Sequence, residues 1–162
     1  MGLSEVSNIL WQERQLLELL LFKLEEEQVL LASGRTRWVA HATREVELVL
    51  DQIRRAEQVR AAHTRAAAAE LRLPADVSMV NLAKAAPAPW SDLLHQHHRA
   101  FLALTAEITA MAKANRELAT GGQRAAQETM LKVTGAVETY SGRRAGGRRE
   151  GERRARLVDE AI

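Results

Sequence analysis

The sequence predicts an all-α protein: an elongated antiparallel helical bundle or coiled coil of three long helices, with a short helix and a C-terminal amphipathic helix added. Three observations support this fold class. Apolar residues recur at alternating spacings of three and four over three long segments, as in helices that pack along one another. Leu, Ala, Glu and Arg dominate, and aromatic residues make up only 4%. Apolar clusters with the period of two that indicates a strand are absent from the sequence.

The segment 3–31 carries the strongest helical pattern, because leucines recur in it every seven residues. Trp11, Phe22 and Val29 form a second apolar line, about 100° round the helix. A helix with two apolar lines is expected to contact more than one neighbour. We therefore expect this segment to be the central helix of the bundle. The leucines of the first line are Leu3, Leu10, Leu17, Leu24 and Leu31.

The ends of this first helix are indicated by two residues that suit helix termini. Ser4 is a suitable N-cap, and Gly34 suits the left-handed position that follows a helix. The run of three glutamates at 25–27 lies in the C-terminal half. A solvated face is the ordinary explanation for such a run, and an acidic docking patch is the alternative.

A second helix is predicted from about Trp38 to Leu71, because a seam of apolar residues alternates in threes and fours. The seam weakens after Ala56. The segment 66–69 consists of four alanines, which favour a helix but offer little surface for packing. We expect the far end of this helix to be thinly packed or covered by another element. The seam consists of Val39, Ala42, Val46, Val49, Ile53 and Ala56.

The segment 72–89 is predicted to be an elbow that reverses the chain, because it contains all three prolines. Ser78 is expected to cap a short helix over 79–85. A long helix follows over 90–118. Its seam is polar only at His97 and Asn115, and polar seam residues commonly fix the register of packed helices.

The C-terminal part of the sequence is expected to be a separate, loosely attached helix. Gly121-Gly122 interrupts the helical pattern, and an amphipathic segment follows over 123–140, weakened by Gly135 at about 1 kcal/mol relative to alanine. The sequence thus predicts a single helical domain over 1–142, followed by a disordered Arg/Gly-rich tail over 143–162.

Composition limits the environment and the classes of function. The chain has no cysteine, which excludes disulfides and favours a cytoplasmic location. No apolar run approaches the ~20 residues that span a bilayer, so membrane insertion is not expected. The net charge is +2, and the excess of basic residues lies in the tail, which holds seven arginines against four acidic residues.

No set of residues has the pattern of a catalytic or metal site. His95, His97 and His98 are closely spaced, but two of them share a face while His97 lies on the seam, and no paired carboxylate ligands accompany them. Nucleophile motifs and phosphate-binding loops are absent from the sequence. We therefore expect neither an enzyme nor a protein with a cofactor or metal.

Two functions remain open on the residues alone. The arginines of the tail fit phosphate binding, but acidic residues dilute them and aromatic residues do not interleave with them. A nucleic-acid-associated helical protein is thus the alternative. The amphipathic segment 123–140 is either a permanently packed last helix or a face that is offered to a partner helix. In the second case Met130, Leu131, Val133 and Val137 are the expected contacts.

Several short motifs resemble the FlgN family of flagellar export chaperones, in the form found in high-GC Gram-positive bacteria. The resemblance covers about residues 3–142. The matching pieces are Leu10-Trp11 with Glu13, the segment 16–25, the turn Gly34-Arg35-Thr36-Arg37-Trp38, the segment 42–47, Leu82-Ala83, Ala86-Pro87 with Pro89-Trp90, Asn115-Arg116 and Thr139-Tyr140.

This resemblance implies a cytoplasmic chaperone of the flagellar type III export apparatus. Such chaperones hold hook-associated proteins, which form the hook–filament junction, and deliver them to the export gate and its ATPase complex. By similarity, the C-terminal helix binds the client, and Tyr140 is the tyrosine that docks on the gate. The sequence does not identify the client, and its seams fit either a monomer or a homodimer.

Overall fold

The computed structural model describes the backbone of residues 2–159 and the side chains of residues 2–136. Over this part of the chain the protein is helical with no strand, so the predicted all-α class is confirmed. The chain divides into two compact units, Met1–Ala119 and Thr120–Ile162. The helices are α1 (Gly2–Ala32), α2 (Thr36–Glu70), α3 (Met79–Ala85) and α4 (Trp90–Asp159).

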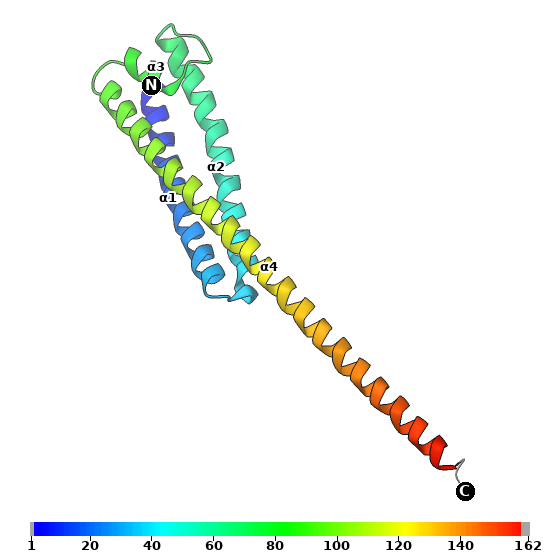
Figure 1. Ribbon diagram of the computed structural model, residues 1–162. Coiled ribbons are helices and arrows are strands. Elements are labelled where there is room, and N and C mark those ends of the chain that lie inside the picture. Colours follow the sequence, from blue (N-terminus) through cyan, green and yellow to red (C-terminus); the bar gives the residue numbers. More distant parts are fainter. Residues whose placement is uncertain (1, 160–162) are drawn as a thin grey trace. The chain divides into compact units, whose positions relative to one another are not determined.

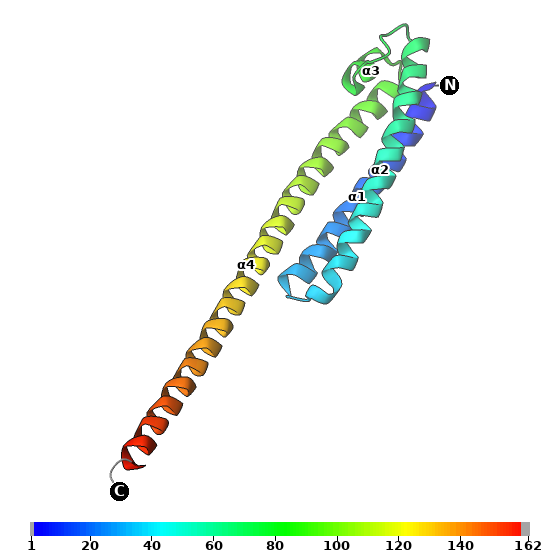
Figure 2. The ribbon, with the colours of Figure 1, turned by 90° about the vertical axis from the view of Figure 1, so that its right-hand side faces the viewer.

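Helices α1 and α2 form an antiparallel hairpin, as the two views show (Figures 1 and 2). Gly34 closes it with a positive φ of 69°, a conformation that glycine adopts without steric cost. The amide of Arg35 donates to the carbonyl oxygen of Leu30 over 3.1 Å and thereby satisfies one of the last carbonyls of α1. The left-handed position predicted for Gly34 after the first helix is confirmed.

The N-terminus of α1 differs from the expectation, because the helix begins at Gly2 and Ser4 lies inside it. The backbone nitrogen of Gly2 donates to the carboxylate of Glu70 at 3.2 and 3.3 Å, so an acidic side chain from α2 takes the role expected of Ser4. Gly2 also approaches α2 closely: a Cβ atom at this position would lie 2.9 Å from Cα of Ala67. Only glycine fits there.

The elbow after α2 confirms the predicted cap and shows how the alanine-rich end of α2 is packed. The Ser78 hydroxyl accepts a hydrogen bond from the amide of Asn81 over 3.3 Å at the start of α3. Ala67 and Ala68 are fully buried. Small side chains allow close approach here, so this end of α2 is covered rather than thinly packed. The surrounding cluster consists of Leu3, Val6, Leu10, Ala67, Leu82, Ala83, Ala86 and Leu94.

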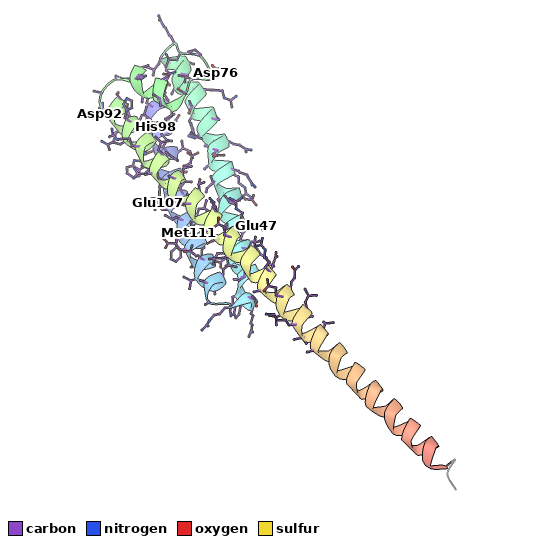
Figure 3. The ribbon with its side chains drawn as sticks, viewed as in Figure 1. Glu47, Asp76, Asp92, His98, Glu107 and Met111 are labelled. Atoms are coloured by element: carbon purple, nitrogen blue, oxygen red, sulfur yellow. The ribbon has the colours of Figure 1, made fainter. Side chains whose placement is uncertain are left out.

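A second apolar cluster holds the middle of the first unit together. Leu20 and Leu24 of α1 pack with three residues of the predicted α2 seam. Ile108 and Met111 of α4 pack against this cluster, and Figure 3 labels Met111 on the helix. The α2 residues are Val46, Val49 and Ile53.

The first part of α4 packs on α1 through the two polar positions of its seam. His97 and Asn115 are both buried, as the seam pattern predicts. Ser7 of α1 lies opposite His97, and the carbonyl of Leu24 lies opposite Asn115. Because Ser7 precedes Leu24 and His97 precedes Asn115, α1 and α4 run in the same direction, with α2 antiparallel to both.

The predicted break at Gly121-Gly122 is wrong, because the backbone is helical through both glycines and through Gly135. The predicted C-terminal helix is therefore part of α4. Each glycine costs about 1 kcal/mol relative to alanine, but the flanking Ala, Glu, Gln and Arg residues favour a helix. Helix α4 is assigned as far as Asp159. The domain boundary at 142 and the disordered tail over 143–162 stay predictions.

Candidate partner-binding surface

The predicted partner-binding residues lie on the helical backbone of the second unit. Met130, Leu131 and Val133 have exposed fractions of 67%, 73% and 55%. Val137 and Tyr140 lie on the same helix, and their side chains are outside the described residues. Three large apolar side chains within four residues are thus open to solvent.

These three side chains do not form one face. At about 100° per residue, Met130 and Val133 lie about 60° apart and form a common stripe, whereas Leu131 lies about 160° from Val133. A single partner helix that contacts Met130 and Val133 therefore leaves Leu131 at the margin. The structure brings together two of the predicted contacts and separates the third.

The three closely spaced histidines are not brought together with other ligand side chains into one group. In the described part of the chain, no group of three or more His, Cys, Asp or Glu side chains is arranged to hold a metal ion. His97 is buried, and its Nε2 lies 3.5 Å from Oγ of Ser7. Its Nδ1 has no hydrogen-bond partner, so the orienting group of a catalytic Ser–His pair is missing.

The environment of His97 favours the neutral imidazole. Burial lowers the pKa of His97, and the positive charge of Arg14 lowers it further. The ring meets Trp11 edge-on, with centroids 4.9 Å apart and an interplanar angle of 82°. These contacts indicate a structural histidine that fixes α4 against α1.

A partly buried ion pair connects the same part of α1 to α2. Oε1 of Glu13 accepts a hydrogen bond from Nε of Arg60 over 3.1 Å, and Glu13 is buried. Burial raises the pKa of Glu13, while Arg60 opposes this effect. The pair explains why an acidic residue is tolerated on the packed side of α1.

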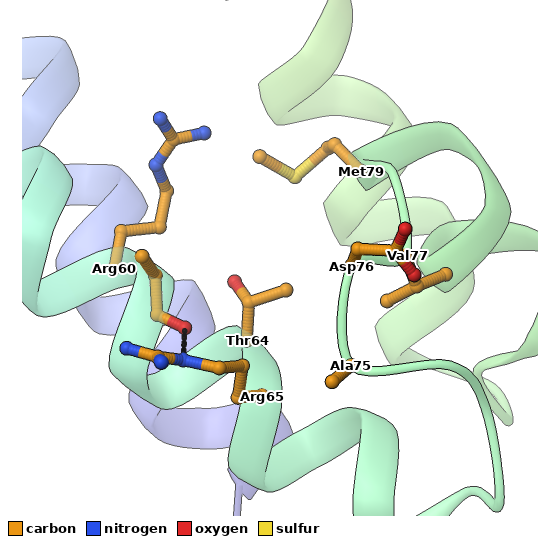
Figure 4. A pocket seen from close by; sticks show the side chains of 8 residues that line it. Arg60, Thr64, Arg65, Ala75, Asp76, Val77 and Met79 are labelled. Atoms are coloured by element: carbon orange, nitrogen blue, oxygen red, sulfur yellow. Dashed lines mark hydrogen bonds between the residues drawn. The ribbon is translucent and has the colours of Figure 1, made fainter.

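A hollow of about 320 Å³ lies between α2 and the chain that enters α3 (Figure 4). Arg60 and Arg65 come from α2, and Asp76 and Met79 lie across the hollow. Nε of Arg65 donates to the carbonyl oxygen of Ala61 over 3.2 Å, and Nε of Arg60 is paired with Glu13. This arrangement holds opposite charges around a small space.

Part of the second apolar line of α1 is open to solvent, which differs from the expectation. The second apolar line of α1 was expected to contact a neighbouring helix, but Phe22 and Val29 are 53% and 66% exposed. Helix α1 does contact both α2 and α4, through leucines such as Leu24, through Ser7 and, from the second line, through Trp11, whose ring meets His97 of α4. The signal for this surface was present in the sequence as the Trp11–Phe22–Val29 spacing.

Over the residues that the structure describes, none of the helices combines the length and the apolarity that crossing a bilayer requires. Each of the two units has exposed apolar side chains on its helices, and the buried polar contacts of the first unit serve packing. These features define the class of protein: an all-α protein with apolar helix faces open to solvent.

The comparison with known families is specific. The family model described as FlgN protein matches residues 1–149, which is most of the chain. The chain therefore belongs to the FlgN family, which is a family of flagellar export chaperones and not of enzymes. No curated protein and no solved structure matches the chain significantly.

Proposed function

We propose that this protein is a cytoplasmic chaperone that binds hook-associated proteins through the face of α4 around Met130 and Val133 and delivers them to the flagellar export gate and its ATPase. The observation that supports this site is the exposure of Met130 and Val133 on a helix within the family match. An unpacked apolar stripe on a helix fits the apolar face of a second helix.

The chemistry of this stripe suits a client that must be released again. Methionine is flexible and polarisable, so Met130 adapts to apolar side chains of different shape. A stripe of a few exposed side chains also buries less area than a permanent interface, which favours exchange of the client at the export gate. The function needs binding and release, and no covalent step.

The proposed site is tested by co-purification of the full chain with a hook-associated protein. Val133→Asp with Val137→Asp places two charges on the proposed contact face and is expected to abolish co-purification. The matched control is Leu48→Asp with Val59→Asp, which adds the same charges at exposed apolar positions of α2. Retained binding in the first variant, or equal loss in both, contradicts the assignment.

Tyr140 has a separate proposed role in docking on the export gate, which rests on the family resemblance of Thr139-Tyr140. Tyr140→Ala is therefore expected to retain the client in co-purification and to reduce its export from motile cells. Tyr140→Phe keeps the aromatic ring and removes the hydroxyl, so it shows which of the two groups the docking requires. Loss of client binding in Tyr140→Ala would instead make this residue part of the client contact.

Deletion of 143–162 tests the alternative, nucleic-acid binding by the arginine tail. The chaperone proposal expects the shortened chain to bind its client as before. Salt-sensitive binding of RNA or DNA by the full chain, lost on this deletion together with the biological activity, would favour the alternative.

A further inference from the structure

Helix α1 carries an apolar stripe that none of the functions above uses. The α1 stripe consists of Trp11, Leu19, Phe22 and Val29, all of which are exposed. Around Phe22 and Val29 the surface forms a shallow depression of about 490 Å³, which Leu30 also lines. Scattered exposed apolar residues are ordinary, but a row of them along one helix marks an interaction surface.

The geometry of the stripe fits another helix. At about 100° per residue, Trp11, Phe22 and Val29 fall within about 20° of one another, and Leu19 lies about 80° from Trp11. From Trp11 to Val29 the stripe is about 27 Å long at 1.5 Å per residue. An occupant helix of about 18 residues would cover it, with apolar side chains spaced in threes and fours.

The stripe is also held rigidly, which reduces the entropy lost on binding. The opposite side of α1 is packed in the core through residues such as Leu20 and Leu24. The Trp11 ring is held between His97, which meets it edge-on, and Arg14, whose Cζ lies 4.5 Å from the ring centroid. The surface is therefore formed before a partner arrives.

The charges beside the stripe select the kind of partner. Glu18 and Glu25 are exposed on the same face, and Glu25 and Glu26 line the depression. Two cations lie nearby: Lys23 is already paired, with Glu26 at 3.3 Å and Glu45 at 3.0 Å, and the guanidinium of Arg14 lies over the Trp11 ring. A second copy packed in parallel would bring Glu18 and Glu25 against their own counterparts, whereas a helix with basic flanks would be attracted along the whole stripe.

We propose that the α1 stripe is a docking surface for a basic amphipathic helix of a partner protein. The occupant presents apolar side chains to Phe22 and Val29 and places lysines or arginines beside Glu18 and Glu25. This surface lies in the first unit, and the proposal does not depend on the client contacts assigned to Met130 and Val133.

Fluorescence anisotropy of a labelled peptide tests the proposal with the full chain. The probe is an 18-residue helical peptide of leucine and lysine, with leucines spaced in threes and fours, and its counterpart carries glutamate in place of lysine. The lysine peptide is expected to bind at least about tenfold more tightly than the glutamate peptide. Phe22→Ser with Val29→Ser is expected to weaken its binding at least about tenfold.

Two further variants separate this surface from general charge attraction. Leu48→Ser with Val59→Ser changes exposed apolar residues of α2 and should leave the affinity within about twofold. Glu18→Gln with Glu25→Gln should weaken binding and flatten its salt dependence. Binding of the lysine peptide that is unaffected by Phe22→Ser with Val29→Ser, or equal binding of both peptides, would overturn the proposal.

The location and the occupant are checked directly. Because the chain has no cysteine, Glu25→Cys provides a unique site for a photo-crosslinker, which should capture the lysine peptide. Sedimentation then tests whether a second copy of the chain occupies the stripe instead. A dimer of the full chain that Phe22→Ser with Val29→Ser abolishes would show that a second copy covers the stripe and would overturn the proposed partner.

Discussion

Asn115 of α4 donates a hydrogen bond from its side-chain nitrogen to the backbone carbonyl oxygen of Leu24 on α1 over 2.8 Å. The same nitrogen lies 3.0 Å from Oε1 of Glu27. Asn115 is buried among apolar residues of the second cluster, so this contact is directional where most neighbouring contacts are not. It fixes the register of α4 against α1.

Replacement of Asn115 tests this role. Asn115→Ala removes the donor and leaves a small void, and we expect the free energy of unfolding to fall by about 1–3 kcal/mol. Asn115→Asp should cost more at neutral pH, because a carboxylate would face the Leu24 carbonyl oxygen and the Glu27 carboxylate. Chemical denaturation measures both variants. Asn81→Ala, an exposed position, is the control, and equal effects at the two sites would refute the role of Asn115.

The Glu13–Arg60 pair predicts a pH-dependent defect. Arg60→Ala leaves Glu13 buried without its partner, and we expect a loss of about 2–4 kcal/mol at pH 8. The pKa of Glu13 is already raised by burial and should rise further in this variant. An acid with a raised pKa in the folded state destabilises the fold as pH rises through that pKa, so the defect should shrink as pH falls toward about 4.5.

Urea denaturation of the parent and of Arg60→Ala over this pH range measures the effect. Arg54→Ala breaks a solvent-exposed pair with Asp51 and is the matched control. We expect it to change stability by less than about 1 kcal/mol at every pH. A defect of Arg60→Ala that is independent of pH would show that Glu13 is not the group that senses the change.

His97 predicts a pH dependence of the opposite sign. Its pKa is lowered in the folded state, first by burial and then by Arg14, so the unfolded chain binds a proton more readily. Stability is therefore present above the unfolded pKa of about 6.5 and is lost as pH falls below it. His97→Gln should flatten this loss between pH 7 and 5. Thermal unfolding over this pH range measures how stability changes with pH. An unchanged dependence in the variant would refute the assignment.

Two glycines on long helices predict alanine substitutions with opposite outcomes. Gly2→Ala would place Cβ 2.9 Å from the backbone of Ala67, and we expect it to destabilise the first unit by about 1–3 kcal/mol. Gly121→Ala meets no atom within 4 Å and should stabilise its helix by about 1 kcal/mol. Denaturation reports the first effect, and amide exchange near residue 121 reports the second.

Much of the first unit could be predicted from residue spacing, because packed helices repeat their contacts. The α2 seam, the Ser78 cap and the polar positions His97 and Asn115 all follow from local rules. The pairing of Glu70 with the amide of Gly2 could not be predicted, since these residues are far apart in sequence and meet only after the hairpin forms.

Two expectations failed for identifiable reasons. Gly121-Gly122 was expected to end a helix, but glycine lowers helix stability without forbidding a helix, unlike proline. The Trp11–Phe22–Val29 line was expected to contact a neighbouring helix, and Trp11 meets His97, but Phe22 and Val29 are exposed. Periodicity shows that a face is apolar without showing whether this chain or a partner covers it. The client contacts remain proposals for the same reason.

The central claim is that a hook-associated protein binds the α4 face around Met130 and Val133. Amide hydrogen exchange of the full chain, with and without this client, tests the claim most directly. The account predicts slower exchange over residues 123–140 in the complex, with little change in α2. Unchanged exchange over 123–140, together with protection confined to another part of the chain, would contradict it.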